Sequence, residues 1–201
     1  MHGGVCQLQL YVIYFILLIL CVNMIRKWKL QKRKKVFHSK FVNVYMDRVK
    51  LPNGRVIRDY MLVEKSDYVM VVATDIKNRI IIQREYKHGA GEIQFTLPAG
   101  LIGRGESPIE AAKRELEEET GYSNGKFTYI GMFTEYATKD LHKAYVVRAS
   151  ELKTKGAQRL EDTEDIEVKL STAYQIKKQI RDKKWHNSSA IAALALSGIL
   201  F

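Results

Sequence analysis

The sequence predicts an α/β fold in which a mixed sheet is covered by helices, preceded by a separate N-terminal segment. Three observations support this prediction. Apolar runs typical of strands, such as 68–75 and 79–86, mix with helical patterns without strict alternation. Residues 107–121 carry start and stop signals of a short helix in mid-chain. Residues 6–25 are uncharged and are followed at once by a cluster of Lys and Arg.

The net charge of +11 is concentrated near the N-terminus. Residues 1–50 hold ten Lys or Arg against one acid, Asp47, whereas residues 51–201 hold 23 bases and 21 acids. The larger part of the chain is therefore nearly neutral and lacks the basic stripe of a nucleic-acid binder. Cys6 and Cys21 lie together in one apolar stretch. They offer neither a disulfide framework nor a metal cluster.

The uncharged stretch 6–25 approaches the roughly 20 residues that a membrane-spanning helix needs. No basic segment precedes it and no small-residue cleavage site follows it, which argues against a signal peptide. We interpret residues 1–35 as an apolar anchor with a basic flank. That flank would keep the following domain in the cytoplasm and attract it to anionic lipid. Two alternatives stay open: a start at Met24, which gives a soluble cytoplasmic protein, and a buried core helix.

Residues 36–64 are predicted to form an N-terminal β-hairpin. Asn53-Gly54, the preferred pair of a type I′ turn, joins 42–51 to 55–63, which are both rich in strand-forming residues. Residues 65–201 are predicted to form the main domain. Its expected strands are 68–75, 79–86, 127–134, 141–149 and 166–170, and its acidic loop is 156–165. Its two late helices run from a cap at Ser171 to about Asp182 and from a cap at Asn187 or Ser188 to Leu200.

The central helix is marked at both ends. Ser107 is a favourable N-cap, Pro108 suits the first helical position and Glu110 completes a capping box. Gly121 is placed to end the helix in a left-handed cap. The residues expected to face the core are Ile109, Ala112 and Leu116.

Three carboxylates share one face of this helix. Glu115, Glu118 and Glu119 stand at i, i+3 and i+4, so their charges repel one another. A divalent cation such as Mg²⁺ removes that penalty, and it commonly bridges carboxylates to substrate phosphates. A solvated charged helix is the alternative, but it does not explain the glycines before the helix or the Arg114-Glu115 pair. The pattern therefore predicts a metal site.

Residues 100–122 resemble the Nudix box. That pattern reads Gly, five residues, Glu, seven residues, Arg-Glu, an apolar residue, any residue, Glu-Glu, any residue, Gly and an apolar or aromatic residue. The residues that fill these positions are Gly100, Glu106, Arg114, Glu115, Leu116, Glu118, Glu119, Gly121 and Tyr122.

From about residue 36 onward the chain resembles the ADP-ribose pyrophosphatase branch of Nudix hydrolases. The resemblance includes QREYKHGAGEIQFTLPAG before the box, the acidic loop that leads into EDIEVKLS, and the tail KKWHNSSAIAALAL. One departure concerns the loop after the box, EYATKDLHKAY, which lacks the proline-containing loop of many ADP-ribose enzymes.

The resemblance implies a Nudix α/β/α sandwich and a Mg²⁺-dependent hydrolase, with Mn²⁺ as a substitute. The implied reaction cleaves the pyrophosphate of ADP-ribose or a related nucleoside diphosphate sugar to a nucleoside monophosphate and a sugar phosphate. GDP-mannose or a dinucleotide is the alternative substrate. A non-hydrolytic nucleotide sensor is the alternative of a different class. The branch also implies a homodimer in which the hairpin of one subunit reaches the other.

The resemblance also assigns roles to the acids. Glu115 and Glu119 are the implied main metal ligands, assisted by Glu118 and by the backbone carbonyl of Ala99. Arg114 is expected to orient a box glutamate through a bidentate bond. Glu106 is expected to support the metal ligands without binding the metal itself. The residues that could act as general base are Glu164 and Asp162, with Glu161 behind them, or a box glutamate; a solvated acidic loop is the alternative.

The predicted substrate contacts are Arg84, Glu85 and Lys139. Arg84 would hold a phosphate or stack on a base, and its alternative is an ion pair with Glu85. The other residues that could line the pocket are Lys87, His88 and His142, while Tyr86 and Phe95 are interpreted as packing residues.

Overall fold

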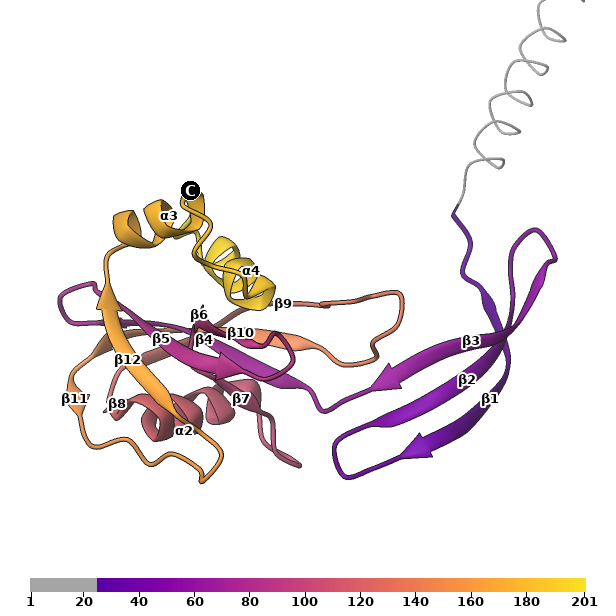
Figure 1. Ribbon diagram of the computed structural model, residues 1–201, viewed down its shortest axis with the longest axis horizontal. Coiled ribbons are helices and arrows are strands. Elements are labelled where there is room, and N and C mark those ends of the chain that lie inside the picture. The colour runs from indigo at the N-terminus through magenta and orange to yellow at the C-terminus, as the bar shows by residue number, and fades with distance from the viewer. Residues whose placement is uncertain (1–24) are drawn as a thin grey trace, which may run out of the picture. The chain divides into compact units, whose positions relative to one another are not determined.

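The computed structural model describes residues 25–201, and Figure 1 shows a large mixed sheet between helical layers. The strands are β1 (Lys29–His38), β2 (Asn43–Lys50), β3 (Val56–Glu64), β4 (Tyr68–Asp75), β5 (Ile80–Lys87), β6 (Glu92–Thr96), β7 (Ala99–Leu101), β8 (Tyr122–Ser123), β9 (Lys126–Phe133), β10 (Ala144–Leu152), β11 (Thr154–Lys155) and β12 (Ile166–Ser171). The helices are α2 (Pro108–Thr120), α3 (Ala173–Arg181) and α4 (Ser188–Leu196).

The described residues fall into two compact units. The smaller comprises the described chain as far as Val36 together with Tyr45–Met61, and the larger comprises Phe37–Val44 and Leu62–Phe201. A three-stranded sheet in the order β1-β2-β3 provides most of the smaller unit. The hairpin β2–β3 agrees with the prediction, but β1 was not predicted. The basic run becomes a strand because it pairs with β2, where Arg33 donates to both carboxylate oxygens of Asp47 at 2.8 and 2.7 Å.

The turn between β2 and β3 differs from the predicted type I′ turn. The N–H of Gly54 donates to the carbonyl of Leu51 at 2.9 Å, so Pro52 and Asn53 are the central residues. Gly54 has φ +88°, whereas Asn53 is not among the residues with positive φ. A type I′ turn needs positive φ at both central residues, and proline fixes a negative φ. Pro52 therefore moves the turn back by one residue.

The larger unit contains the mixed sheet, with strands in the order β12-β5-β4-β10-β9. β4 and β10 run parallel, and β10 pairs with β9 in the antiparallel sense, as does β5 with both β4 and β12. β6 pairs with β5 and β7 pairs with β4, so these two short strands lie off the main strand order. The predicted strand at 68–75 is confirmed at its stated limits.

Side chains of β4 alternate between two cores. Val69 and Val71 pack with Ala112 and Leu116 of α2, which confirms the predicted inner face of that helix. Met70 and Val72 belong to the opposite core, with Ile176 of α3 and Ala193 and Leu194 of α4. A strand buried on both faces explains the continuous apolar run YVMVVA. The predicted mixed α/β sandwich is confirmed for the larger unit.

The helix limits confirm most of the local signals. Ser107 caps α2 through a complete capping box with Glu110, and Gly121 follows in the left-handed conformation at φ +73°. The cap of α3 is Thr172, not Ser171 as predicted, because the hydroxyl of Thr172 accepts from the N–H of Gln175. α4 ends at Leu196, before the predicted Leu200, and Gly198 follows at φ +79°.

The predicted membrane anchor at 6–25 lies almost entirely outside the described residues. Within residues 25–201, no helix has the length and apolar character needed to cross a membrane.

Candidate active site

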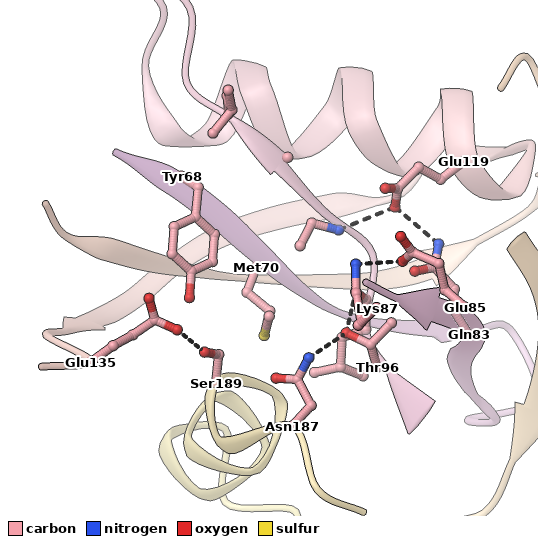
Figure 2. Close-up of a pocket in the computed structure, with 14 residues that line it drawn as sticks. Tyr68, Met70, Gln83, Glu85, Lys87, Thr96, Glu119, Glu135, Asn187 and Ser189 are labelled. Atoms are coloured by element: carbon pink, nitrogen blue, oxygen red, sulfur yellow. Dashed lines mark hydrogen bonds and ion pairs between the residues drawn. The ribbon is translucent and has the colours of Figure 1, made fainter. Parts of the chain in front are cut away.

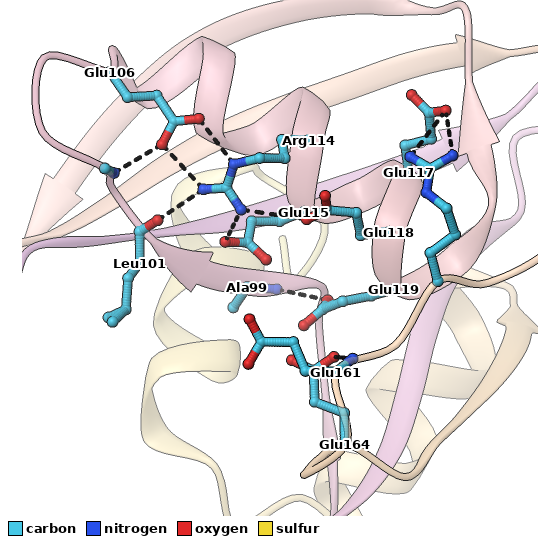
Figure 3. Close-up of polar contacts among 12 residues, drawn as sticks. Ala99, Leu101, Glu106, Arg114, Glu115, Glu117, Glu118, Glu119, Glu161 and Glu164 are labelled. Atoms are coloured by element: carbon cyan, nitrogen blue, oxygen red, sulfur yellow. Dashed lines mark hydrogen bonds and ion pairs between the residues drawn. The ribbon is translucent and has the colours of Figure 1, made fainter.

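Arg114 lies at the centre of the acidic face of α2 (Figure 3). Its Nε and Nη2 donate to the two carboxylate oxygens of Glu106, each at 3.0 Å, and Nη2 also donates to the carbonyl of Leu101 at 2.9 Å. Its Nη1 lies 2.6 Å from Glu115 and 3.3 Å from Glu118. The hydrogen bond from Arg114 lowers the pKa of Glu106, and the same bond raises the pKa of Arg114. Arg114 therefore ties the preceding loop to the helix and offsets part of its negative charge.

Glu115 lies against the loop that precedes the helix. A Cβ built on Gly100 would come 1.9 Å from the carboxyl carbon of Glu115, so the glycine permits this close approach. Burial raises the pKa of Glu115, and the charges of Glu118 and Glu164 raise it further against the opposing effect of Arg114.

Glu119 is the most buried box carboxylate, with 5 % of its surface exposed. Its Oε2 accepts hydrogen bonds from Nε2 of Gln83 at 2.9 Å and from the N–H of Ala99 at 3.1 Å. Burial raises the pKa of Glu119 to about 8, and the charges of Glu115 and Glu164 act in the same direction. Gln83 was missed by the sequence analysis. Its only signal was a polar residue directly after the apolar run Ile80–Ile82.

The acidic loop 156–165 is fixed to the C-terminal end of α2. The N–H of Gly156 donates to the carbonyl of Gly121 at 2.7 Å, and the N–H of Arg159 donates to the carbonyl of Glu118 at 2.8 Å. The side chain of Gln158 donates to the carbonyl of Glu119 at 2.7 Å. These bonds satisfy carbonyl groups that the helix end leaves open. They also hold the loop beside the box glutamates.

The loop brings one of its predicted acids toward the box. Glu164 is half-buried and its Oε2 accepts from the N–H of Glu161 at 2.9 Å. Its charge raises the pKa of both Glu115 and Glu119, which places it near them, and Figure 3 shows it beside Glu119. Asp162 is exposed.

These carboxylates match the ligand chemistry of a hard divalent cation. Burial and mutual repulsion raise the pKa values of Glu115 and Glu119, and a bound cation would relieve both effects. Among the described residues, no three or more His, Cys, Asp or Glu side chains already form a metal-binding group. Instead, Glu115 and Glu118 pair with Arg114, and Glu119 pairs with Gln83.

A cavity of about 370 Å³ adjoins Glu119 and Ala99 (Figure 2). Alternate residues of β5 line it, namely Gln83, Glu85 and Lys87, and Nζ of Lys87 lies 2.6 Å from Glu85. Of the two predicted contacts on this strand, Glu85 therefore lines the cavity and Arg84 does not.

Arg84 points to the other face of β5. It pairs with Glu167 at 3.1 Å and its guanidinium lies 5.8 Å from the ring centroid of Phe95. The alternative ion pair between Arg84 and Glu85 is wrong, because neighbouring residues of a strand face opposite sides. Lys139 is exposed, and its backbone N–H donates to the carbonyl of Tyr136 at 2.9 Å.

The far end of the cavity holds a second polar cluster. Glu135 accepts from Oγ of Ser189 and lies 2.8 Å from Nε2 of His142, and the hydroxyl of Tyr68 lies beside it. Figure 2 shows Glu135, Ser189 and Tyr68 at the opposite end from Glu119. His142 was only a possible pocket residue in the sequence analysis, and no local pattern indicated Glu135 or Ser189.

Comparison with known proteins identifies the family. Residues 65–192 match the family model described as "NUDIX domain". The chain belongs to the Nudix family. Hydrolases of this family generally use divalent metals.

Individual relatives agree with this membership. The chain is 28 % identical to an ADP-ribose pyrophosphatase of Bacillus subtilis over 165 residues, which cover 81 % of this chain and 88 % of the relative. It is 30 % identical over 168 residues to a methanol dehydrogenase activator of Bacillus methanolicus, with the same coverage of both chains. The predicted resemblance to the ADP-ribose pyrophosphatase branch is thereby confirmed.

A solved structure shows the same fold. The crystal structure of an ADP compounds hydrolase superposes with a TM-score of 0.74 at 22 % identity, covering 88 % of this chain and 95 % of the other. At that identity the comparison supports a statement about the fold alone. It supports the Nudix sandwich derived from the sheet order and the two cores.

Proposed function

We propose that this Nudix protein is a Mg²⁺-dependent hydrolase that cleaves the pyrophosphate of ADP-ribose or a related nucleoside diphosphate sugar. Its products would be a nucleoside monophosphate and a sugar phosphate. The similarity to an ADP-ribose pyrophosphatase over 81 % of the chain supports the substrate class. The observation that carries the proposal is that buried Glu119, which lines one end of a cavity, and half-buried Glu115 repel each other and both have raised pKa values.

The box residues would bind the cation. Glu115, Glu118 and Glu119 supply carboxylate oxygens, and the carbonyl of Ala99 adds a neutral one, while Mn²⁺ is a possible substitute ion. The cation would offset phosphate charge and polarise the scissile phosphorus–oxygen bond. Arg114 would keep its bidentate hydrogen bonds to Glu106. These bonds fix the helix to the glycine-containing loop that precedes it.

Other residues of the cavity would meet the substrate. Lys87 lines the cavity and carries the positive charge that a diphosphate requires, and Glu85 holds its ammonium group in place. This arrangement favours Lys87 over the predicted Arg84, which lies on the other face of β5. Glu164 would accept a proton from the attacking water, since it lies near the same carboxylates. A homodimer and a membrane association through residues 6–25 stay predictions.

The test is a substrate panel. We expect purified protein with Mg²⁺ to release AMP from ADP-ribose faster than it cleaves GDP-mannose or NADH. A matched Glu119→Gln variant removes one ligand charge at nearly constant size, and we expect it to lose roughly 100-fold or more in kcat. Glu151→Gln is the control, because Glu151 pairs only with surface Lys126 among the contacts described.

Two outcomes would contradict the proposal. Faster cleavage of GDP-mannose or NADH would reassign the substrate. Tight binding of one nucleotide with turnover of none would indicate a sensor.

A further inference from the structure

The carboxylate of Glu135 is held inside the cavity by two hydrogen-bond donors and a neighbouring hydroxyl, which come from three different parts of the fold. Ser189 belongs to α4, Tyr68 begins β4, and His142 lies just before β10. Burial alone would raise the pKa of Glu135, but the hydrogen bonds from Ser189 and His142, together with the neighbouring hydroxyl of Tyr68, lower it. Glu135 is therefore an anchored anion, with 31 % of its side chain exposed.

His142 fixes the direction of this carboxylate. Its side chain is 2 % exposed, and the carboxylate can only accept, so the proton lies on Nε2. Nδ1 is buried without a hydrogen-bond partner among the described residues, and Oδ2 of Asp140 lies 3.7 Å from it. Asp140 pairs with Lys65 at 2.9 Å. A buried polar atom without a hydrogen-bond partner, such as Nδ1 of His142, is costly, which argues that the placement of Glu135 has a use.

A carboxylate can accept about four hydrogen bonds, and two donors, Ser189 and His142, already reach Glu135. Acceptor capacity thus remains on Glu135, which lines the cavity. Burial raises the pKa of Tyr68 far above its usual value, with Ser189 acting against this shift and the charge of Glu135 adding to it, so the hydroxyl stays neutral. This end of the cavity would repel a phosphate and accept a neutral group that offers O–H or N–H donors.

Three parts of a nucleoside diphosphate sugar offer such donors: the terminal sugar, the ribose of the nucleoside and the base. ADP keeps the ribose of the nucleoside, so a comparison with ADP separates it from the terminal sugar. A base is usually held by stacking on aromatic rings. Tyr68 is the only aromatic residue among the described residues that line this cavity, and its hydroxyl lies beside Glu135 and Ser189 (Figure 2). A sugar presents several hydroxyl groups and needs acceptors, which this end provides.

We propose that Glu135 determines specificity by accepting a hydrogen bond from a hydroxyl of the terminal sugar, with His142, Ser189 and Tyr68 as the residues that position it. This assignment rests on the proposed function. It places the phosphates at the Glu119 end of the cavity and the sugar at the Glu135 end. No residue of the Nudix box takes part in it.

The experiment compares ligands with and without the terminal sugar. Dissociation constants of ADP-ribose and ADP are measured by calorimetry in Ca²⁺, an oxygen-binding cation chosen to limit turnover. We expect Glu135→Gln to weaken the binding of ADP-ribose by about tenfold or more, because the amide oxygen is an uncharged and weaker acceptor than the carboxylate. ADP should bind within about twofold of wild type or more tightly, because the substitution removes a negative charge.

Two further arms identify the donor and guard against misfolding. IDP-ribose lacks the exocyclic amine of adenine, so its binding should fall as much as that of ADP-ribose. Tyr68→Phe keeps the ring but removes the hydroxyl beside Glu135, and we expect a smaller loss that is again confined to the sugar-bearing ligands. Glu151→Gln is the control, and melting temperatures are compared for all variants.

Each outcome decides the assignment. Equal losses for ADP and ADP-ribose, or no loss for either, would overturn it. If Glu135→Gln weakens the binding of ADP-ribose but not that of IDP-ribose, the contact is to the base and the assignment is overturned. If the wild type hydrolyses nothing but the selective loss is found, the hydrolase proposal fails while the sugar contact stands. Full turnover in Glu135→Gln with an unchanged KM would leave the hydrolase and remove the contact.

Discussion

Asp162 and Glu164 lie two residues apart in one acidic loop but have different surroundings. Asp162 is exposed, whereas Glu164 is half-buried and accepts from the N–H of Glu161. The charge of Glu164 raises the pKa of both Glu115 and Glu119, and Figure 3 shows it beside Glu119. A general base must lie within hydrogen-bonding reach of the water that it activates. At the scale of the residue, Glu164 is therefore the better candidate.

This difference gives a matched pair of substitutions. We expect Glu164→Gln to lower kcat by about 10²–10⁴-fold, while Asp162→Asn stays within about threefold of wild type. Saturating steady-state assays with ADP-ribose and Mg²⁺ measure both. Similar, small changes in the two variants would remove Glu164 as the base and leave that role to a box glutamate.

At the scale of the element, the end of α2 is joined to the acidic loop through two glycines. Gly121 adopts φ +73°, and a Cβ on it would lie 2.3 Å from the carbonyl oxygen of Gly156. The N–H of Gly156 in turn donates to the carbonyl of Gly121 at 2.7 Å, and this bond anchors the loop. The position of Glu164 thus depends on how closely the loop approaches the helix end.

Gly121→Ala tests this contact, with Gly105→Ala as its control. Gly105 also has positive φ, at +79°, but a Cβ there meets nothing within 4 Å. We expect Gly105→Ala to cost roughly 1 kcal/mol from backbone strain alone. Gly121→Ala should cost at least about 1 kcal/mol more, because the backbones must separate. Urea unfolding measures both, and equal losses would show that the loop gives way freely.

At the scale of the whole molecule, the cavity draws residues from both helical layers. α2 supplies Glu119 from one side of the sheet, while α4 supplies Ser189 from the other. β6 and β7 pair only with single strands of the sheet, and Thr96, Ala99 and Leu101 of these strands line the cavity between the layers. Cation binding at Glu119 should therefore stabilise the larger unit as a whole.

Metal removal tests that stabilisation. A cation that binds only the folded protein adds about 2.7 kcal/mol at 100 times its dissociation constant, which is roughly 5–10 °C in Tm for a chain of this size. We expect Mg²⁺ to raise Tm by this order relative to EDTA, with KCl at equal ionic strength as the control. Glu119→Gln should lose most of the increase. An unchanged Tm in wild-type protein would argue against a cation site in the box.

The sequence by itself determined the parts that depend on neighbours along the chain. Capping residues and apolar spacing predicted α2, and the spacing of Glu115, Glu118 and Glu119 predicted their common face, because one helical turn sets both. The box match predicted the family for the same reason, since its residues lie within 100–122.

Only the tertiary structure decided which distant groups meet these acids. Gln83 reaches Glu119 across 36 residues, and Ser189 reaches Glu135 across 54, through sheet pairing and helix packing. The alternation of β5 then turned Lys87 toward the cavity and Arg84 away from it. Strand register and layer packing are long-range properties, so no local pattern in the chain could supply these contacts.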